Sequence, residues 1–199
     1  MPRSVDQDEQ RERIARAAWL VIGEVGLERA SLRQIAQRAD CTTGLLTHLF
    51  ADRDALIAHA LDEQDRVLGT MIDEAVAGAT DGRDALARNL FIQCAAFDGH
   101  EHDGVLLRRF ASALADKAVG EGLRRFYDKS EAGLARLVTA AQEDGSFAAR
   151  GPAAELAEHL LIVADGIYVA GVVRPDRYTN ARRRTLIDRE ISLLEDNTP

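Results

Sequence analysis

The segment from Ser31 to Arg53 limits what this chain can fold into more than any other stretch, because it predicts two short helices joined by a tight turn. Ser31 can accept a hydrogen bond from the backbone N–H of Gln34, and the Gln34 side chain can reach back to Ser31, a reciprocal pattern known as a capping box. Apolar residues then recur at helical spacing, at Leu32, Ile35, Ala36 and Ala39. We therefore expect a short amphipathic helix after Ser31.

A second helix is expected after a turn at Asp40 and Cys41. Thr42 is a suitable N-cap, and apolar residues again share one face, at Leu45, Leu46, Leu49 and Phe50. A helix-turn-helix of this form can place its second helix in the major groove of DNA, although the same arrangement also occurs as a plain helix pair. The segment therefore makes double-stranded DNA a candidate partner.

The whole chain favours an all-α fold. Hydrophobic residues at 46% and charged residues at 29% are ordinary for a globular protein of 199 residues, and no stretch sustains the alternating β-branched pattern of strands. Helical periodicity predicts about nine helices. Besides the two short ones, they are expected at about 8–25, 53–77, 86–97, 105–116, 121–143, 152–173 and 180–194.

The helix expected at 53–77 divides the chain into two domains. At 1.5 Å per residue it would be about 36 Å long, too long to belong to a 50-residue unit alone. We expect a three-helix domain with the helix-turn-helix over residues 1–53, and a second helical domain over residues 54–199.

The net charge of −8 gives no basic footprint for nucleic acid. Residues 1–55 hold eight Arg against nine Asp and Glu, so the N-terminal part is only mildly less acidic than the rest. What matters is whether the arginines near the helix-turn-helix face one way, which composition does not reveal. Global charge neither confirms nor excludes DNA binding.

The chain lacks the sequence signals of export and of a membrane span. Its first ten residues are polar, and its longest apolar run, 160–173, is shorter than the 18–20 residues of a span and contains Asp165. Cys41 and Cys94 lie 53 residues apart without a CxxC pattern, which predicts neither a disulfide framework nor a zinc site. We expect a cytoplasmic protein with no membrane partner and no cofactor.

Two charged clusters have plain explanations. The sequence His100-Glu101-His102-Asp103 lacks the i, i+4 histidine pairing of zinc hydrolases, so we expect a solvated loop rather than a metal site. Arg182, Arg183 and Arg184 stand at a helix start, where the helix dipole disfavours them. They fit a solvated or interface-pairing face better than an auxiliary DNA patch.

Residues 11–61 resemble the tetracycline-repressor (TetR) family of bacterial transcription regulators. The family's pattern is matched by Gly26-Leu27, Ser31, Ile35-Ala36, Gly44, His48, Phe50 and Arg53. GLLTHLF and DGIYVAGVVRPDRY are also similar to the betaine-pathway repressor branch. The resemblance implies a ligand-responsive homodimeric repressor that binds a pseudo-palindromic operator and is released by a small-molecule effector.

The resemblance also implies a set of DNA contacts. Arg33 corresponds to a position that reaches base edges or phosphate, and Arg53 to a phosphate contact, against the alternative that Arg53 pairs with Asp52 or Asp54. The N–H groups at the start of the second short helix would favour phosphate. The full set is Arg33, Thr42, Thr43, Gly44, Thr47, His48 and Arg53.

Two positions depart from the family pattern. Thr47 stands where many members have tyrosine, so it keeps a hydroxyl for a phosphate or thymine contact but loses reach and stacking area. Leu49 replaces a second aromatic residue and is expected in the core. These changes affect which operator is read rather than whether DNA is bound.

Family members keep an effector cavity among helices four to eight, which makes Phe91, Cys94, Phe97 and Phe110 candidate lining residues, although core packing would also explain them. The last two helices are expected to pair with a second subunit through Leu160, Val163, Ile167, Gly171, Ile187 and Ile191. The effector itself cannot be read from the sequence.

Two other classes of function remain open at this point. One is a small all-α enzyme or ligand carrier with an incidental helix-turn-helix, although the sequence has no nucleophile elbow, HExxH, P-loop or dinucleotide fingerprint, so we expect no catalytic residue. The other is a TetR-like activator that responds to no small molecule.

Overall fold

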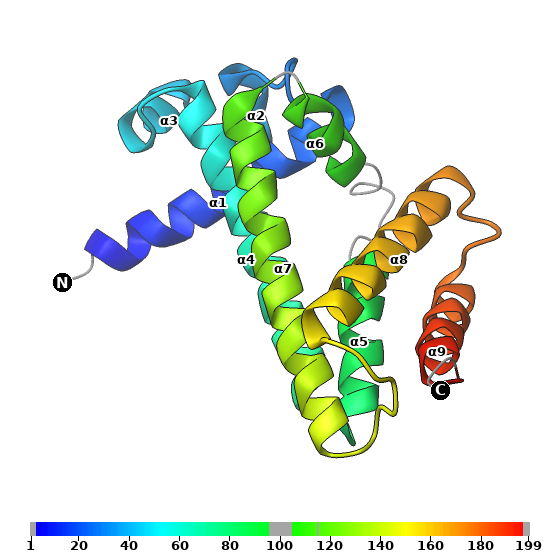
Figure 1. Ribbon diagram of the computed structural model, residues 1–199. Coiled ribbons are helices and arrows are strands. Elements are labelled where there is room, and N and C mark those ends of the chain that lie inside the picture. Colours follow the sequence, from blue (N-terminus) through cyan, green and yellow to red (C-terminus); the bar gives the residue numbers. More distant parts are fainter. Residues whose placement is uncertain (1–2, 96–104, 115, 197–199) are drawn as a thin grey trace. The chain divides into compact units, whose positions relative to one another are not determined.

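The computed structural model describes residues 3–95, 105–114 and 116–196, which form nine α-helices and no strand (Figure 1). The expected all-α fold is confirmed. The helices are α1 (Arg3–Val25), α2 (Leu32–Arg38), α3 (Thr43–Leu49), α4 (Arg53–Ala77), α5 (Gly82–Ala95), α6 (Val105–Ala113), α7 (Lys117–Glu143), α8 (Ala153–Val173) and α9 (Asn180–Asp196).

The chain divides into two compact units. The N-terminal unit comprises residues 1–67 and 99–125, and the C-terminal unit comprises residues 68–98 and 126–199. Helices α4 and α7 contribute residues to both units. Contacts thus group α6 and the start of α7 with the helix-turn-helix. The boundary predicted at residue 53, between a DNA-binding domain and a second domain, is defined by function rather than by contacts and stays a prediction.

Most helix boundaries agree with the sequence-based ranges, and the differences have local causes. Helix α7 begins earlier than expected because the Asp116 carboxylate caps it, accepting hydrogen bonds from the N–H groups of Ala118 (2.9 Å) and Val119 (3.2 Å). Helix α6 accordingly ends earlier, at Ala113. Helix α1 extends back to Arg3, through an acidic stretch that suits the positive end of the helix dipole.

The core of the N-terminal unit is built from the inward faces of α1 to α4. Its fully buried side chains include Ile14, Ile22, Ile35, Leu46 and Leu56. Burying each large aliphatic side chain stabilises the fold by about 1.5–3 kcal/mol. This matters most for α2 and α3, because helices of seven residues are not stable alone in water.

A buried ion pair connects α6 to α4 within the N-terminal unit. The Arg109 guanidinium is 2% exposed and donates two hydrogen bonds to the Asp65 carboxylate, at 2.6 and 3.0 Å. Two parallel bonds of this kind fix orientation as well as distance. Removing either partner would leave a buried charge uncompensated, at about 3–5 kcal/mol.

In the C-terminal unit, α5 packs against both α8 and α9. Helix α8 has the length and apolar composition of a membrane span, with a mean hydropathy of 1.7 in its most apolar window. The core helix of a soluble protein passes the same test, and α8 buries Ala157, Leu160, Leu161, Ala164, Ile167, Tyr168 and Gly171 within its own unit. We interpret α8 as a core helix.

Arg183 joins three helices of the C-terminal unit from a buried position. Its Nη1 donates to the carbonyl of Cys94 near the end of α5 (2.9 Å), and its Nε donates to the carbonyl of Tyr178 (2.9 Å). The guanidinium lies against the backbone of α8 at Gly171, where an added Cβ would approach Nη2, Cζ (2.8 Å) and Nε (2.9 Å). Glycine is therefore required at position 171 for Arg183 to bind as it does.

We predict that Gly171→Ala lowers the free energy of unfolding by about 2–4 kcal/mol, because the new methyl group displaces a buried, hydrogen-bonded guanidinium. Gly133→Ala in α7 is the matched control, since its added Cβ would meet only the tip of Arg136 at 3.8 Å. Denaturant unfolding of both variants gives the measurement. Equal stability of the two variants would contradict the role assigned to Gly171.

Candidate nucleic-acid interface

The turn between α2 and α3 has the geometry expected from its sequence. The Ser31 hydroxyl accepts from the Gln34 N–H (3.3 Å), and the Gln34 side chain accepts from the Ser31 N–H (2.9 Å), so the capping box is confirmed. Asp40 adopts a left-handed conformation (φ +50°), which aspartate tolerates better than most residues. The chain then turns sharply into α3.

Helix α3 has one buried and one exposed face. Leu46 and Leu49 are buried in the N-terminal unit, while Thr43, Gly44, Thr47 and His48 are exposed. Thr42, the N-cap, is also exposed and accepts from the N–H of Leu45 (3.3 Å). The structure therefore places five of the seven predicted DNA contacts on one end and one outer face of α3.

Arg33 is exposed on α2, and no residue in the described ranges pairs with its guanidinium. A solvated arginine on the helix that packs against α3 remains available for phosphate oxygens or a guanine edge. Arg38, further along α2, is instead paired with Glu24 at 2.7 Å. Arg33 is thus the α2 arginine best suited to an anionic partner.

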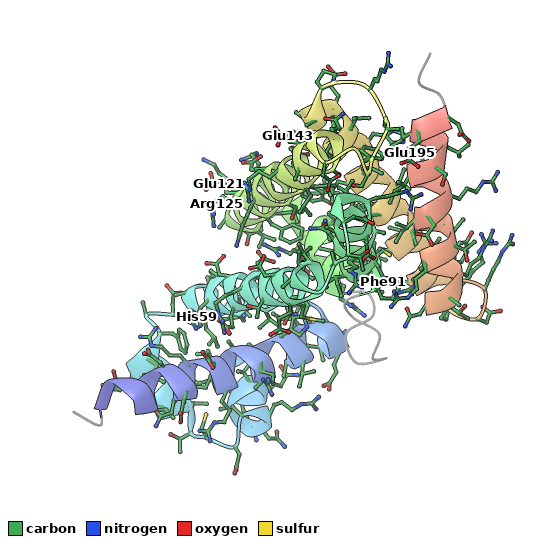
Figure 2. The ribbon with its side chains drawn as sticks, turned by 90° about the horizontal axis from the view of Figure 1, so that it is seen from below. His59, Phe91, Glu121, Arg125, Glu143 and Glu195 are labelled. Carbon is green, nitrogen blue, oxygen red and sulfur yellow. The ribbon has the colours of Figure 1, made fainter. Side chains whose placement is uncertain are left out.

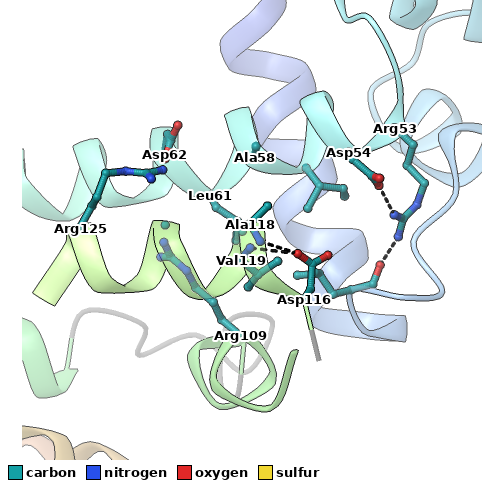
Figure 3. A pocket seen from close by; sticks show the side chains of 13 residues that line it. Arg53, Asp54, Ala58, Leu61, Asp62, Arg109, Asp116, Ala118, Val119 and Arg125 are labelled. Atoms are coloured by element: carbon teal, nitrogen blue, oxygen red, sulfur yellow. Dashed lines mark hydrogen bonds and ion pairs between the residues drawn. The ribbon is translucent and has the colours of Figure 1, made fainter. Parts of the chain in front are cut away.

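Arg53 differs from the other predicted contacts because its guanidinium is already engaged. Nε donates to the carbonyl of Ala30 (2.7 Å), Nη2 donates to the carbonyl of Leu27, and Nη1 pairs with Asp54 (2.9 Å) (Figure 3). The geometry favours the Asp54 pairing that the sequence left as the alternative. Arg53 therefore ties the start of α4 to the loop before α2.

Arg11 is a positioning residue that the sequence did not reveal. Its guanidinium donates to the carbonyl of Leu49 (2.9 Å), the last residue of α3, and lies 5.2 Å from the centre of the Phe50 ring. The bond satisfies a carbonyl that the end of a helix leaves without a partner. Arg11 lies on the polar face of α1, where helical periodicity alone predicts only solvent contact.

A cavity of about 70 Å³ lies in the N-terminal unit beside Arg53 (Figure 3). Its walls are apolar at Leu27, Ile57, Leu61 and Val119, and its charged lining residues come from α4, α6 and α7. Binding sites for drug-sized molecules are typically about 300–1,000 Å³, so this cavity is large enough for a few water molecules only. Phe91, Cys94 and Phe110 do not line it.

The predicted effector-site residues are distributed between the units. Phe91 and Cys94 belong to α5 in the C-terminal unit, Phe110 belongs to α6 in the N-terminal unit, and Phe97 lies outside the described residues. Cys94 is fully buried, and the Arg184 guanidinium lies 3.6 Å from the centre of the Phe91 ring. Phe91 is labelled on α5 in Figure 2. Core packing thus accounts for Cys94, and the set is not brought together around a described cavity.

The predicted dimer residues mostly face the core of their own unit. Leu160, Ile167, Gly171, Ile187 and Ile191 are all buried in the single chain, and Val163 is half-buried. The exposed apolar residues of α8 are instead Ile162 (63%), Val169 (38%) and Val173 (68%), with Gly166 exposed between the first two. The exposed apolar residues of α8 thus lie on the face opposite its buried residues, and the dimer contact itself stays a prediction.

Asp165 is a largely buried carboxylate on α8. It accepts a hydrogen bond of 2.5 Å from the Tyr127 hydroxyl of α7, and no ion pair to it is found within the described ranges. Burial raises the pKa of Asp165 above its ordinary value, and the Tyr127 bond offsets only part of this shift. Among the described residues of the C-terminal unit, none is a cationic partner of Asp165.

Within the described residues, no three His, Cys, Asp or Glu side chains are grouped as a metal ion requires. His100 and His102 lie outside the described residues.

Gly44 lies in α3, and its presence there has no internal structural reason. An added Cβ would meet only the Thr42 hydroxyl oxygen at an ordinary 3.7 Å. We predict that Gly44→Ala raises the free energy of unfolding by about 0.5–1 kcal/mol, because alanine favours the helix, and that it weakens DNA binding, because the methyl group blocks close approach. Denaturant unfolding measures the effect on stability, and fluorescence anisotropy measures the effect on DNA affinity. The control, Gly133→Ala, should stabilise the protein without changing DNA affinity. Equal DNA affinity of Gly44→Ala and Gly133→Ala would contradict this role of Gly44.

Comparisons with known proteins agree with this architecture. Residues 14–60 match the family model for bacterial regulatory proteins of the tetR family, and residues 87–194 match that for the BetI-type transcriptional repressor C-terminal region. The chain is 27% identical to the HTH-type transcriptional regulator PksA of Bacillus subtilis (strain 168) over 199 residues, which cover 98% of this chain and 94% of PksA. These relatives are regulators of transcription and not enzymes.

Solved structures show the same fold. A putative transcriptional regulator from Pseudomonas aeruginosa PAO1 aligns over 96% of this chain and 92% of its own, with a TM-score of 0.82 and 20% identity. A putative transcriptional regulator from Saccharomonospora viridis, determined in complex with choline, aligns over 93% of this chain and 96% of its own, with a TM-score of 0.79 and 19% identity. The chain belongs to the TetR family of DNA-binding transcriptional regulators, and its C-terminal part is of the BetI type.

Proposed function

We propose that this regulator is a homodimeric repressor that binds a pseudo-palindromic operator through residues 1–53 and is released by a small-molecule effector bound within residues 54–199. The observation that carries the proposal is the exposed polar face of α3, held in place by its buried apolar face. Because its proposed partner is DNA, the protein is expected in the cytoplasm.

The proposed DNA-reading surface consists of Arg33, Thr42, Thr43, Gly44, Thr47 and His48, all of which are exposed. Arg53 is proposed to act indirectly, because its guanidinium is bonded to two carbonyls and to Asp54. Two such surfaces related by a two-fold axis would contact half-sites separated by one turn of DNA or a multiple of it. Because phosphate contacts dominate such binding, affinity should fall steeply with salt.

The proposed dimer contact is the exposed apolar stripe of α8. Ile162, Gly166, Val169 and Val173 recur at helical spacing on the face opposite the core residues. Leu193 of α9, 40% exposed, adds a further apolar side chain. A second copy that covers these residues would remove apolar surface from water, which is the main driving force of association.

Two substitutions separate DNA contact from dimerisation. We expect Ile162→Glu to give monomers by light scattering at micromolar concentration and to lose operator affinity, because a charge enters the apolar contact. Arg33→Ala should stay dimeric and bind an operator about 5–100-fold more weakly, with a melting temperature within a few degrees of the wild type. The operator is obtained first by selection from random duplex DNA, where we expect a palindrome.

If light scattering shows that Ile162→Glu is still a dimer, the proposed dimer contact through α8 is wrong. Unchanged affinity of Arg33→Ala would overturn the placement of the reading surface. Selection that enriches no palindrome would overturn the proposed function as a whole.

We propose further that the effector is an organic cation that pairs with Asp165. The support is the largely buried carboxylate, the Tyr127 ring that is hydrogen-bonded to it and packs edge to face with Phe126, and the choline bound by the Saccharomonospora regulator. Carboxylates and aromatic faces are the groups that bind quaternary ammonium ions. Release of DNA then requires that the cation prefer the conformation that does not fit the operator, by about 1–3 kcal/mol or more.

We expect choline to raise the melting temperature of the wild type and to release it from operator DNA, and Asp165→Asn to abolish both effects while leaving DNA affinity intact. Asp128→Asn, at an exposed carboxylate of α7, is the control.

Without choline, the stability contributed by Asp165 falls as pH rises from the ordinary carboxyl pKa through its raised folded-state pKa, because the folded form holds the proton longer. Asp165→Asn should remove this dependence of the free energy of unfolding on pH. If Asp165→Asn still responds to choline, the proposed pairing of the cation with Asp165 is ruled out.

A further inference from the structure

The three threonines on the reading surface differ in how their hydroxyl groups are used. Thr47 donates its hydroxyl hydrogen to the carbonyl of Gly44, at 3.1 Å, within α3 itself. Thr42 accepts from the N–H of Leu45 as the N-cap. The Thr43 hydroxyl makes no hydrogen bond to any residue in the described ranges, so it can both donate to and accept from an external partner, whereas Thr42 keeps its hydrogen free and Thr47 does not.

The bond from Thr47 to Gly44 determines which part of the Thr47 side chain faces outward. Threonine is branched at Cβ, and its χ1 angle is restricted in a helix. When the hydroxyl turns back to a carbonyl of the preceding turn, the methyl group becomes the outer part of this exposed side chain. At its surface Thr47 therefore presents an apolar group on an otherwise polar face.

Gly44 lies three residues before Thr47, on the same face of α3. It has no side chain to cover the Thr47 methyl group or to hold a base edge away from it. In the major groove the one apolar group that a base pair presents is the C5-methyl of thymine. A methyl group beside a glycine gap is complementary to that group in size and in polarity.

We propose that Thr47 is a specificity-determining residue that reads a thymine in each half-site through contact between the two methyl groups. The proposal rests on the proposed function, since it requires α3 to enter the major groove. It makes Thr47 a reader of base identity and leaves polar contacts to Thr43 and His48. A phosphate contact by the Thr47 hydroxyl would instead require its bond to Gly44 to break.

The test uses the full-length protein and the duplex enriched from random DNA. Each thymine of that duplex is replaced in turn by deoxyuridine, which lacks only the methyl group, and affinity is measured by fluorescence anisotropy. For the wild type we expect one symmetry-related pair of positions at which the replacement weakens binding by about four-fold per half-site, the size expected for burying one methyl-sized group.

Three variants then test whether Thr47 is the residue responsible for this loss of affinity. Thr47→Val keeps an outward methyl group and lacks the hydroxyl, so it should bind within about two-fold of the wild type and retain the thymine preference. Thr47→Ser lacks the methyl group and should bind thymine and deoxyuridine equally at that position. Thr43→Val is the matched control for hydroxyl removal on the same helix; it should lose affinity and keep the thymine preference.

Retention of the thymine preference in Thr47→Ser, or loss of binding in Thr47→Val, would overturn the proposal and leave the proposed function standing. The same holds if no thymine of the enriched duplex is sensitive to deoxyuridine. If no duplex is enriched at all, the proposed function fails and this inference fails with it. Melting temperatures of the variants, expected within a few degrees of the wild type, show that each one is folded.

Discussion

The reading surface depends on how a seven-residue helix is held. Helix α3 has too few internal hydrogen bonds to be stable by itself, so its orientation comes from its neighbours. Leu46 and Leu49 anchor one face in the core, Thr42 caps the start, and Arg11 binds the carbonyl at the end. Leu46, Leu49 and Arg11 are not part of the proposed reading surface, and Thr42 uses only its hydroxyl oxygen as the cap, so its hydroxyl hydrogen can still be donated to DNA.

Several arginines bind groups within the protein, and this is one reason why net charge is a poor guide to its partner. Arg11 and Arg53 bind backbone carbonyls near α3, Arg109 binds Asp65, and Arg183 binds the end of α5. These cations are not available to phosphate. Arg33 is exposed and unpaired within the described ranges, so a chain with net charge −8 can still present a cation beside α3.

The features predicted well from the sequence are those set by residues close together in the chain. Ser31 and Thr42 cap helices as expected, because a cap depends on the next two or three residues. The outward face of α8 was not predictable in this way. Its apolar residues surround the helix, so periodicity cannot decide which side meets α5 and α9 and which side meets a partner.

Long-range polar contacts were equally hidden. The packing of the Arg183 guanidinium against Gly171 and the ion pair between Arg109 and Asp65 depend on how distant helices pack. No spacing in the sequence indicates either contact. The same holds for Arg53, whose family position indicates phosphate while its bonds to Ala30 and Asp54 give it a structural role. For such residues, burial and partners decide the role, and both come only from the fold.

The division into units also limits how an effector could act. Asp165 and Tyr127 belong to the C-terminal unit and α3 to the N-terminal unit, and among the described elements only α4 and α7 contribute residues to both. Helix α4 is tied to the loop before α2 by Arg53 and to α6 by the Asp65–Arg109 pair. A helix is stiff along its axis, so a shift of α4 or α7 carries these ties with it. Within the N-terminal unit, a shift of α4 would therefore act on residues that help to position the reading surface.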